Sequence, residues 1–275
     1  MQLEQLGDYI VQKQLGQGAF GAVYLAEHRF IKRSFVLKVL PEELSNDPQF
    51  LRRFETEIAE IAGLEHPHIA KIHNVSLHQG RAYLVMEPVV DALGEAMHLE
   101  RFLQLKGKTL SENEQEQWLR QIASALDYAH EAGVAHGGLK LSNVLVAPDG
   151  PSVKPLLADF GISRMIGEGV AFLRLAEEIA KALMPGVQMS PQRAQDLSRS
   201  FLRNLAFLSP EQRGLESDVA FVKCDAYAFG VLAYYFLCGK LPEGCFDMPS
   251  RILPDHQLNW DLLISRCLQP NPNVR

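Results

Sequence analysis

The feature that most constrains the fold is a glycine cluster near the N-terminus. Gly16, Gly18 and Gly21 are followed by Val23 in the pattern GxGxxGxV. Glycines allow backbone N–H groups to approach a phosphate without a Cβ in the way. The pattern alone also fits a chance turn in a small β-protein or a dinucleotide-binding loop. Because residues 23–26 have a strand-like sequence and a dinucleotide loop leads directly into a helix, we expect a phosphate loop between two strands.

A lysine inside an apolar strand pattern supports that expectation. Lys38 lies within the apolar run 35–40, where its charge is costly unless the ammonium meets an anion or reaches solvent. With the glycine loop before it, a phosphate partner is the more economical explanation. Apolar residues at helical spacing predict a helix over 47–64, and Glu57 on that helix is the natural counter-ion of Lys38.

The order of elements predicts an α+β fold with two lobes. Residues 9–40 alternate apolar and polar side chains, and 69–75 and 83–86 have the patterns of further strands. Residues 87–91 include a proline and form an extended connector. We therefore expect an N-lobe over 1–87, a hinge over 87–91 and a mainly helical C-lobe over 92–275.

Helix and hairpin signals follow the connector. Ser111 with Glu114 predicts a capping box, and apolar spacing continues to Ala132, with Gly133 as the end of the helix. Apolar segments on both sides of a Pro-Asp-Gly turn predict a hairpin over 143–158. The hairpin ends at the sequence Asp-Phe-Gly.

With these residues the chain resembles bacterial Hanks-type serine/threonine protein kinases over nearly its whole length. Further segments match that family in order and at family spacing. They are His66-Pro-His-Ile69, Tyr83-Leu-Val-Met-Glu87, His136-Gly-Gly-Leu-Lys-Leu-Ser-Asn143, Asp159-Phe-Gly161, Ser209-Pro-Glu211 and Asp225-Ala-Tyr-Ala-Phe-Gly230. The resemblance implies that Arg275 pairs with Glu211. It also places Arg275 before the family's final helix, so we expect a truncated C-lobe.

The resemblance implies ATP and Mg²⁺ as cofactors. In the family the glycine loop covers the phosphates, and the residue at Lys38 grips the α- and β-phosphates with Glu57 as its partner. The residues at Asn143 and Asp159 hold Mg²⁺, and the one at Lys140 stabilises charge on the transferred phosphoryl group.

An apolar adenine slot is also implied by the resemblance. Its predicted members are Leu15, Val23, Val36, Met86 and Leu145, with Glu87 beginning the hinge. Val36 stands where the family usually has alanine, and its two extra methyl groups would tighten the slot. We expect adenine to bind there, with reduced affinity.

The central departure from the family is Gly138, which occupies the place of the catalytic aspartate. That aspartate orients the substrate hydroxyl and accepts its proton, and glycine offers no carboxylate. Glu131 and Asp149 are the nearest acids in sequence, and neither is at a position that obviously reaches the hydroxyl. The sequence therefore predicts loss of direct base catalysis.

Two neighbouring departures support this prediction. Gly137 replaces the arginine that would bind a phosphorylated activation loop. Arg203 and Asn204 replace the Gly-Thr of the family pattern GTxxYxxPE, whose threonine bridges the catalytic aspartate and lysine. Three changes in one constellation indicate loss of the transfer machinery.

The segment between Gly161 and Ser209 is long for the activation loop that the resemblance implies. Residues 172–183 carry an apolar stripe at helical spacing, which ends at Pro185. The stripe fits a helix that packs on the protein's own C-lobe, or alternatively a docking face for a partner helix.

Composition excludes several classes of protein. A net charge of −6 gives no global basic field for nucleic acid or anionic membranes. The four cysteines form no CxxC pair, so we expect reduced thiols in a cytoplasmic protein. The apolar stretch 226–238 is short for a membrane span and predicts a buried core helix.

The leading hypothesis is a pseudokinase that binds ATP with Mg²⁺ and regulates or scaffolds a partner or client protein. One alternative is an active, atypical serine/threonine kinase that transfers the γ-phosphate by positioning and electrostatics alone. A further alternative is an interaction module that needs no nucleotide.

Overall fold

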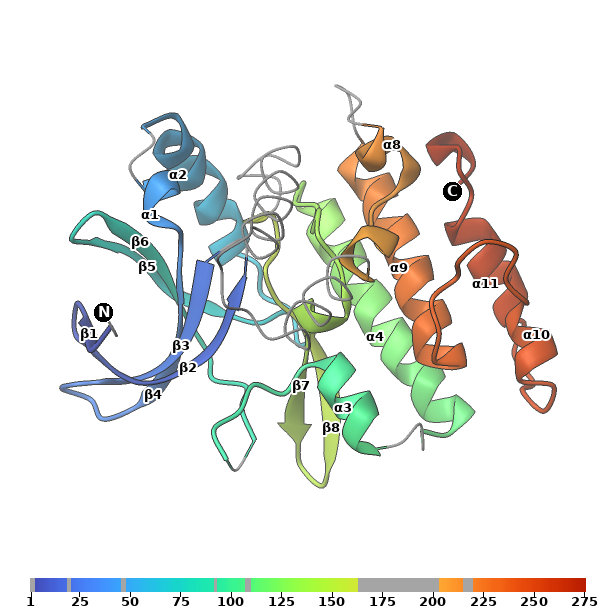
Figure 1. Cartoon of the computed structure of the whole chain (residues 1–275), viewed down its shortest axis with the longest axis horizontal. Coiled ribbons are helices and arrows are strands. Elements are labelled where there is room, and N and C mark those ends of the chain that lie inside the picture. The colour runs from blue at the N-terminus through green and yellow to red at the C-terminus, as the bar shows by residue number, and fades with distance from the viewer. Residues whose placement is uncertain are drawn as a thin grey trace, which may run out of the picture.

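The computed structural model has a sheet-containing N-lobe and a mainly helical C-lobe (Figure 1). The residues that it describes are 3–18, 21–45, 48–91, 93–106, 110–162, 203–214 and 220–275. This arrangement confirms the predicted α+β fold with two lobes.

One antiparallel sheet forms the N-lobe. Its strands run in the spatial order β1-β2-β3-β4-β6-β5. Their bounds are β1 Gln5–Leu6, β2 Tyr9–Gly18, β3 Gly21–His28, β4 Ser34–Val39, β5 Ile72–His78 and β6 Arg81–Met86. One face of the sheet packs a separate small core that includes Tyr9, Leu37 and Tyr83.

Strand β5 begins later than the sequence predicts. Residues 69–75 were expected to form it, but the backbone N–H of Ala70 donates to the carbonyl of Leu157 at 2.8 Å, and Leu157 N–H donates to the carbonyl of His68 at 2.8 Å. Residues 68–70 therefore pair with the C-lobe instead of the N-lobe sheet. These backbone hydrogen bonds join the two lobes directly below the hinge.

Helix α2 (Pro48–Ala62), which follows the short α1 (Glu42–Ser45), covers the inner side of the sheet (Figure 1). Phe50, Phe54, Ile58 and Ile61 recur at helical spacing and are all buried. The end of α2 also packs against the Asp-Phe-Gly segment. A Cβ added to Gly161 would lie 2.6 Å from Ile61 Cδ1. The helix predicted over 47–64 is thus confirmed, with slightly shorter ends.

The C-lobe consists of helices around a two-stranded hairpin. The helices are α3 Leu99–Lys106, α4 Glu112–Glu131, α8 Pro210–Arg213, α9 Phe221–Cys238, α10 Pro249–Ile252 and α11 Trp260–Cys267, with 3₁₀ turns at Leu141–Asn143 and Pro272–Val274. The hairpin is β7 Val144–Asp149 and β8 Ser152–Leu157, as predicted.

The predicted capping box starts α4. Ser111 Oγ accepts a hydrogen bond from Glu114 N–H at 3.4 Å, and Glu114 Oε2 accepts one from Ser111 N–H at 2.8 Å. Gly133 follows the helix with a φ of 78°, the left-handed conformation that glycine adopts without strain. Both ends of α4 therefore form as the sequence predicts.

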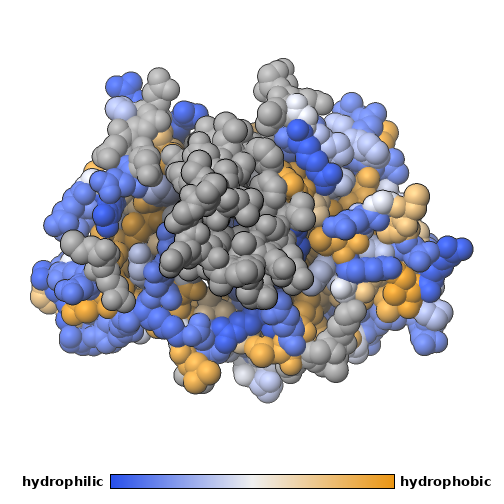
Figure 2. Space-filling view, in the orientation of Figure 1, coloured by the Kyte–Doolittle hydropathy of each residue, from blue (hydrophilic) through white to orange (hydrophobic). Residues whose placement is uncertain are grey.

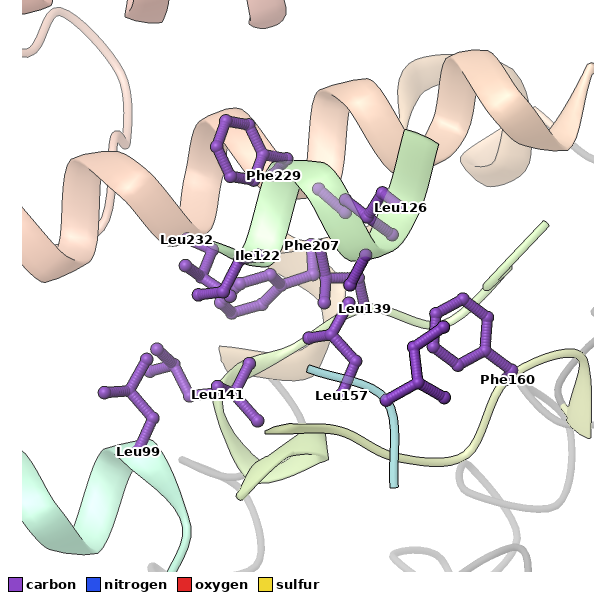
Figure 3. Packing of buried hydrophobic residues seen from close by; sticks show 14 of the residues in the cluster. Leu99, Ile122, Leu126, Leu139, Leu141, Leu157, Phe160, Phe207, Phe229 and Leu232 are labelled. Carbon is purple, nitrogen blue, oxygen red and sulfur yellow. The ribbon is translucent and has the colours of Figure 1, made fainter. Parts of the chain in front are cut away.

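The main core lies where α4 and α9 meet the loop and hairpin between them. Figure 3 shows Ile122 and Leu126 of α4 close to Leu139, Leu157 and Phe229, and all of these side chains are buried. Figure 2 shows hydrophilic residues over much of one face, with hydrophobic ones scattered between them. The apolar side chains are thus concentrated inside, and they support the loop that precedes the hairpin.

Helix α9 is the central helix of this core. Phe221–Cys238 is long and apolar enough to span a membrane by length and composition, but 67% of it is buried within the protein. That burial agrees with the prediction of a core helix. Its two cysteines, Cys224 and Cys238, are buried thiols outside any disulfide, and Cys245 and Cys267 are not in a disulfide either.

A buried ion pair joins α8 to the end of the described chain. Arg275 Nη1 and Nη2 donate to Glu211 Oε1 and Oε2 at 2.8 and 2.7 Å, and the two side chains are 0% and 5% exposed. This is the predicted pairing of Arg275 with Glu211. Burial alone would raise the pKa of Glu211, but the hydrogen bond and charge of Arg275 hold it below its ordinary value.

We expect Glu211→Gln and Arg275→Met each to lower the free energy of unfolding by about 3 kcal/mol, because each leaves a buried charge unpaired. Urea denaturation measures this loss. The double variant should lose less than the sum of the two single losses. Arg251→Met is the control, since Arg251 pairs with Asp247 at an exposed site and its loss should cost less than about 1 kcal/mol. Additive losses in the double variant would contradict the coupling.

Candidate nucleotide-binding site

The glycine loop connects β2 and β3 as an antiparallel turn. Gly18 pairs with Gly21 at the end of the two strands. Gly21 has a φ of +113°, and a Cβ on it would lie 1.9 Å from the carbonyl oxygen of Val39, so this position requires glycine. A Cβ on Gly16 would meet nothing within 4 Å, which leaves space beside the strand. The predicted glycine turn between two strands is confirmed, and its role in phosphate binding stays a prediction.

Lys38 points its ammonium group at the carboxylate of Asp159. It lies on β4, opposite Val23 on one side and Leu84 on the other, and is 4% exposed. Its Nζ lies 2.6 Å from Asp159 Oδ2. Strand β4 is thus joined to the segment that follows β8, across the junction of the two lobes. The Glu57 side chain lies half-buried on α2, and its pairing with Lys38 stays a prediction.

Asp159 is held as an anion by the charges around it. Burial alone would raise its pKa, but the charge and hydrogen bond of Lys38, with His136 and Lys140 nearby, keep the pKa below its ordinary value. Asp159 also has a φ of 69°, a conformation that is uncommon for a residue other than glycine. Such local strain is typical of functional positions, where the surrounding structure imposes it.

Lys140 experiences the charges of the same two groups, Asp159 and Lys38. Burial lowers the pKa of this lysine, and Lys38 acts in the same direction, while Asp159 raises it. Lys38 and Lys140 therefore both lie within electrostatic range of the Asp159 carboxylate. A cluster of this kind is suited to an anion such as a phosphate chain.

Asn143 is oriented by the glycine in the catalytic-aspartate place. Its Nδ2 donates to the carbonyl oxygen of Gly138 at 2.9 Å, and its side chain is largely buried. The Asn143 amide oxygen accepts a long hydrogen bond from Ser142 Oγ at 3.5 Å and has a second lone pair that could face a cation. Asn143 and Asp159 thus provide oxygen ligands of the kind that Mg²⁺ prefers.

The loop that carries these residues is fixed by Asp225. The Asp225 carboxylate is 1% exposed and accepts backbone N–H bonds from His136 at 2.7 Å and from Gly137 at 2.8 Å. It also lies 2.8 Å from His130 Nε2. Gly137 has a φ of 70°, so glycine suits this turn.

Sequence reasoning identified Asp225 only as part of a motif and missed this positioning role. The available signal was a carboxylate within an otherwise apolar helix, which is costly unless it is hydrogen-bonded.

The residues of the predicted adenine slot lie near the hinge, on both lobes. Val36 and Met86 are paired across β4 and β6, and both are buried in the main core. Leu15 and Val23 pack partly buried against that core. Leu145 is half-buried on β7, between the buried Val144 and Val146.

At the hinge itself, the Glu87 side chain lies 2.5 Å from His73 Nε2 and is 48% exposed. Farther along, Lys13 on β2 forms an ion pair with Glu95, which lies after the hinge. Arg101 on α3 pairs with Asp91 at 3.0 Å. Lys13 thus links the N-lobe to a residue after the hinge, and Arg101 links α3 back to the hinge.

Arg203, which replaces a glycine of the family pattern, has a definite partner. It forms an ion pair with Glu100 on α3, and both side chains are partly buried. Phe207, four residues later, is 5% exposed and packs in the main core. The predicted apolar stripe over 172–183 lies outside the residues that the structure describes.

Comparison with known proteins agrees with this geometry. The protein kinase domain family matches residues 9–251. Serine/threonine-protein kinase Pkn1 of Chlamydia trachomatis is 35% identical over 273 residues, which cover 99% of this chain and 41% of that protein. Serine/threonine-protein kinase PrkC of Bacillus subtilis is 28% identical over 246 residues, which cover 90% of this chain and 32% of that protein. The chain thus spans less than half the length of either relative.

Solved structures give the same result. A double mutant of the Mycobacterium tuberculosis PknI kinase domain has a TM-score of 0.68 and 25% identity, covering 98% of this chain and 91% of that one. The unsubstituted PknI kinase domain has a TM-score of 0.67 and 26% identity, with 98% and 92% covered.

We expect Gly21→Ala to lower the free energy of unfolding by about 1–3 kcal/mol or more, because its Cβ would collide with the carbonyl of Val39 in a left-handed conformation. Gly16→Ala is the matched control, and its effect should stay below about 1 kcal/mol because its Cβ enters open space. Urea denaturation compares the two variants. Equal losses of unfolding free energy in the two variants would show that the stability of the loop does not depend on the backbone conformation at Gly21.

The depressed pKa of Asp159 predicts a pH dependence of stability. The unfolded aspartate takes up its proton near pH 3.8, whereas the folded one stays ionised to a lower pH. Its contribution is therefore fully present above about pH 4 and is lost as the pH falls through the folded pKa. The difference in free energy of unfolding between wild type and Asp159→Asn should shrink on acidification in urea titrations. A difference that stays constant from about pH 6 to the acid limit would contradict this assignment.

Proposed function

The chain belongs to the protein kinase family, and we propose that it binds ATP with Mg²⁺ but regulates or scaffolds a partner protein instead of transferring phosphate. The observation that carries the proposal is the charged cluster of Lys38, Lys140 and Asp159 beside Gly138. The charged side chains that would hold the nucleotide are present in this cluster. The carboxylate that would act on the substrate hydroxyl is replaced by Gly138.

Several residues are suited to the phosphate chain. Lys38 and Lys140 supply positive charge, and the glycine loop supplies backbone N–H groups from the other side. With a nucleotide in place, Lys38 would exchange part of its contact with Asp159 for phosphate oxygens. Asp159 would then be available to a cation.

The ligands for Mg²⁺ would be Asn143 Oδ1 and the Asp159 carboxylate. Among the described residues, no group of three or more His, Cys, Asp or Glu side chains could hold a metal by itself. Mg²⁺ in nucleotide sites is bound by one or two carboxylates together with substrate phosphates. The bound ion would neutralise charge on the phosphoryl oxygens.

The surroundings of Gly138 support the proposed loss of transfer. The backbone carbonyl of Gly138 is occupied by Asn143, and the residue has no side chain that could accept a proton. Glu131 is exposed at the end of α4. Asp149 is at the tip of the β7–β8 hairpin and lies 3.6 Å from Lys154. Neither acid is placed as a substitute base.

Partner binding is the remaining part of the proposal. The ion pair between Arg203 and Glu100 supports a regulatory role, because it ties the segment before α8 to α3 without a phosphorylated residue. The client or regulatory protein is defined only by what it would detect, namely the nucleotide-bound closed state of the two lobes. We also propose a cytoplasmic location, which is supported by the four cysteines being thiols outside any disulfide.

We expect saturating Mg-ATP to raise the melting temperature by several degrees, because a ligand at about 100 times its dissociation constant stabilises by about 2.7 kcal/mol. Lys38→Met and Asp159→Asn should abolish the shift. Lys71→Met is the matched control, since Lys71 is an exposed lysine outside the site. A wild-type protein without any shift at saturating nucleotide would instead favour the interaction module that needs no nucleotide.

Transfer of the γ-phosphate is tested separately with radiolabelled ATP, using the chain itself and casein as acceptors. We expect no incorporation above the Asp159→Asn background. We also expect little activity from Gly138→Asp, because Gly137 and Asn204 differ from the family as well. Incorporation by wild type that Lys38→Met abolishes would overturn the proposal in favour of an active, atypical kinase.

A further inference from the structure

The segment that follows the hinge is attached to the C-lobe at the predicted adenine slot. The Val146 N–H donates to the carbonyl of Met97 at 2.8 Å, and His98 pairs with Leu145 in an antiparallel bridge. Leu145 is a predicted member of the slot. Residues 93–97, here called the strap, thus end at the strand that carries the C-lobe side of the slot.

The strap also contacts two neighbouring residues of the N-lobe sheet. Lys13 on β2 forms an ion pair with Glu95, and a Cβ added to Gly94 would lie 3.5 Å from Leu25 Cδ2 on β3. Lys13 and Leu25 are paired across the two strands. Leu25 is two residues after Val23, so both side chains project from the same face of β3. The strap therefore meets the N-lobe beside the predicted N-lobe side of the slot.

Asp91 shapes the start of the strap into a turn. Its Oδ1 accepts the N–H groups of Leu93 and Glu95, each at 2.9 Å. The Gly94 N–H donates to the Asp91 carbonyl, and the Asp91 N–H donates to the Glu95 carbonyl, both at 2.9 Å. Gly94 has a φ of 69°, which glycine adopts without strain. These bonds hold the backbone that carries the Glu95 carboxylate.

Arg101 on α3 fixes the same turn to the C-lobe. Its Nη2 donates to Asp91 Oδ2 at 3.0 Å, and its Nη1 donates to the carbonyl of Ala96 at 3.4 Å. Nη1 also lies 3.7 Å from Glu95 Oε2. Glu95 is thus shared by a guanidinium of the C-lobe and the ammonium of Lys13. When the lobes separate, the strap stays with the C-lobe and the ion pair with Lys13 must break.

This ion pair is suited to a restraint that opens and closes. The side chains of Lys13 and Glu95 are 41% and 37% exposed. Ion pairs with such exposure contribute up to about 1 kcal/mol, because solvent screens them and the long side chains lose entropy. A contact of that strength biases the two lobes toward the closed arrangement without locking them together.

We propose that the strap and Lys13 form a gate at the edge of the adenine slot, which opens to admit or release a nucleotide when the Lys13–Glu95 ion pair breaks. The nucleotide part of this inference rests on the proposed function, whereas the restraint acts on the empty chain as well. Because entry and exit pass through the same opening, the gate slows both by the same factor and leaves the dissociation constant unchanged. A side chain that contacts bound nucleotide would act mainly on the dissociation rate.

Stopped-flow fluorescence with Mg²⁺ and N-methylanthraniloyl-ATP measures both rate constants on the 275-residue chain. Lys13→Met and Glu95→Gln should each raise both constants about two- to fivefold, the factor that corresponds to an ion pair of up to about 1 kcal/mol. The double variant should equal the single ones, because either change already breaks the pair. Lys32→Met is the matched control, since Lys32 pairs with Glu27 at 3.4 Å within the N-lobe.

The two single variants also separate the gate from simple electrostatic steering. Steering of an anionic nucleotide would slow association in Lys13→Met and speed it in Glu95→Gln, because one change removes a positive charge and the other a negative one. Opposite changes of this kind, or unchanged rate constants, would overturn the gate and leave the proposed nucleotide binding intact.

Hydrogen exchange of the nucleotide-free chain tests the restraint without a ligand. Peptides that cover residues 93–97 should exchange about two- to fivefold faster in Lys13→Met and Glu95→Gln, and at the wild-type rate in Lys32→Met. Unchanged exchange in all three variants would overturn the restraint. Faster exchange in a chain that binds no nucleotide would overturn the proposed function and the gate, and would leave the strap as a link between the lobes.

Discussion

The structure of the site depends on one buried carboxylate. Asp225 projects from the central helix α9 and accepts the backbone N–H groups of His136 and Gly137. A buried anion without partners would be strongly destabilising, so the loop and the helix each require the other. Because α9 is the core of the C-lobe, this contact gives the loop a rigid base. Lys140 and Asn143 follow a few residues later and take their positions from it.

The second constraint is the backbone link between the lobes. The hydrogen bonds from residues 68 and 70 to Leu157 place the end of the hairpin under the N-lobe, and Asp159 follows directly. Lys38 reaches it from β4, which is itself held in the middle of the sheet. A lysine and an aspartate from different lobes are thereby held 2.6 Å apart. The fold thus holds together the charged pair that would face a phosphate chain and a cation in the function that we propose.

These constraints bear on the proposal that phosphate transfer is lost while nucleotide binding is retained. The phosphate and metal binding that we propose would use charges that are positioned by α9, β4 and the hairpin. Proton abstraction from a substrate hydroxyl would use a carboxylate at position 138. The glycine at that position is compatible with the observed loop conformation but supplies no carboxylate. The neighbouring Gly137 adopts a left-handed backbone that suits glycine, and the Gly138 carbonyl orients Asn143. The pair of glycines is therefore compatible with a well-formed nucleotide site that has no general base.

Local pattern determined much of this protein by itself. Strand alternation, the helical spacing on α2 and α4, the capping box at Ser111 and the glycine loop all rest on interactions between near neighbours, so the sequence alone predicted them. The pairing of Arg275 with Glu211 was implied by the family resemblance and not by spacing along the chain. Only the tertiary structure decided the direct contact of Lys38 with Asp159, the partners of Asp225 and Arg203, and the switch of residues 68–70 to the C-lobe. Each of these joins residues far apart in the chain, and spacing along a sequence carries no information on which distant groups will satisfy a buried charge or backbone N–H.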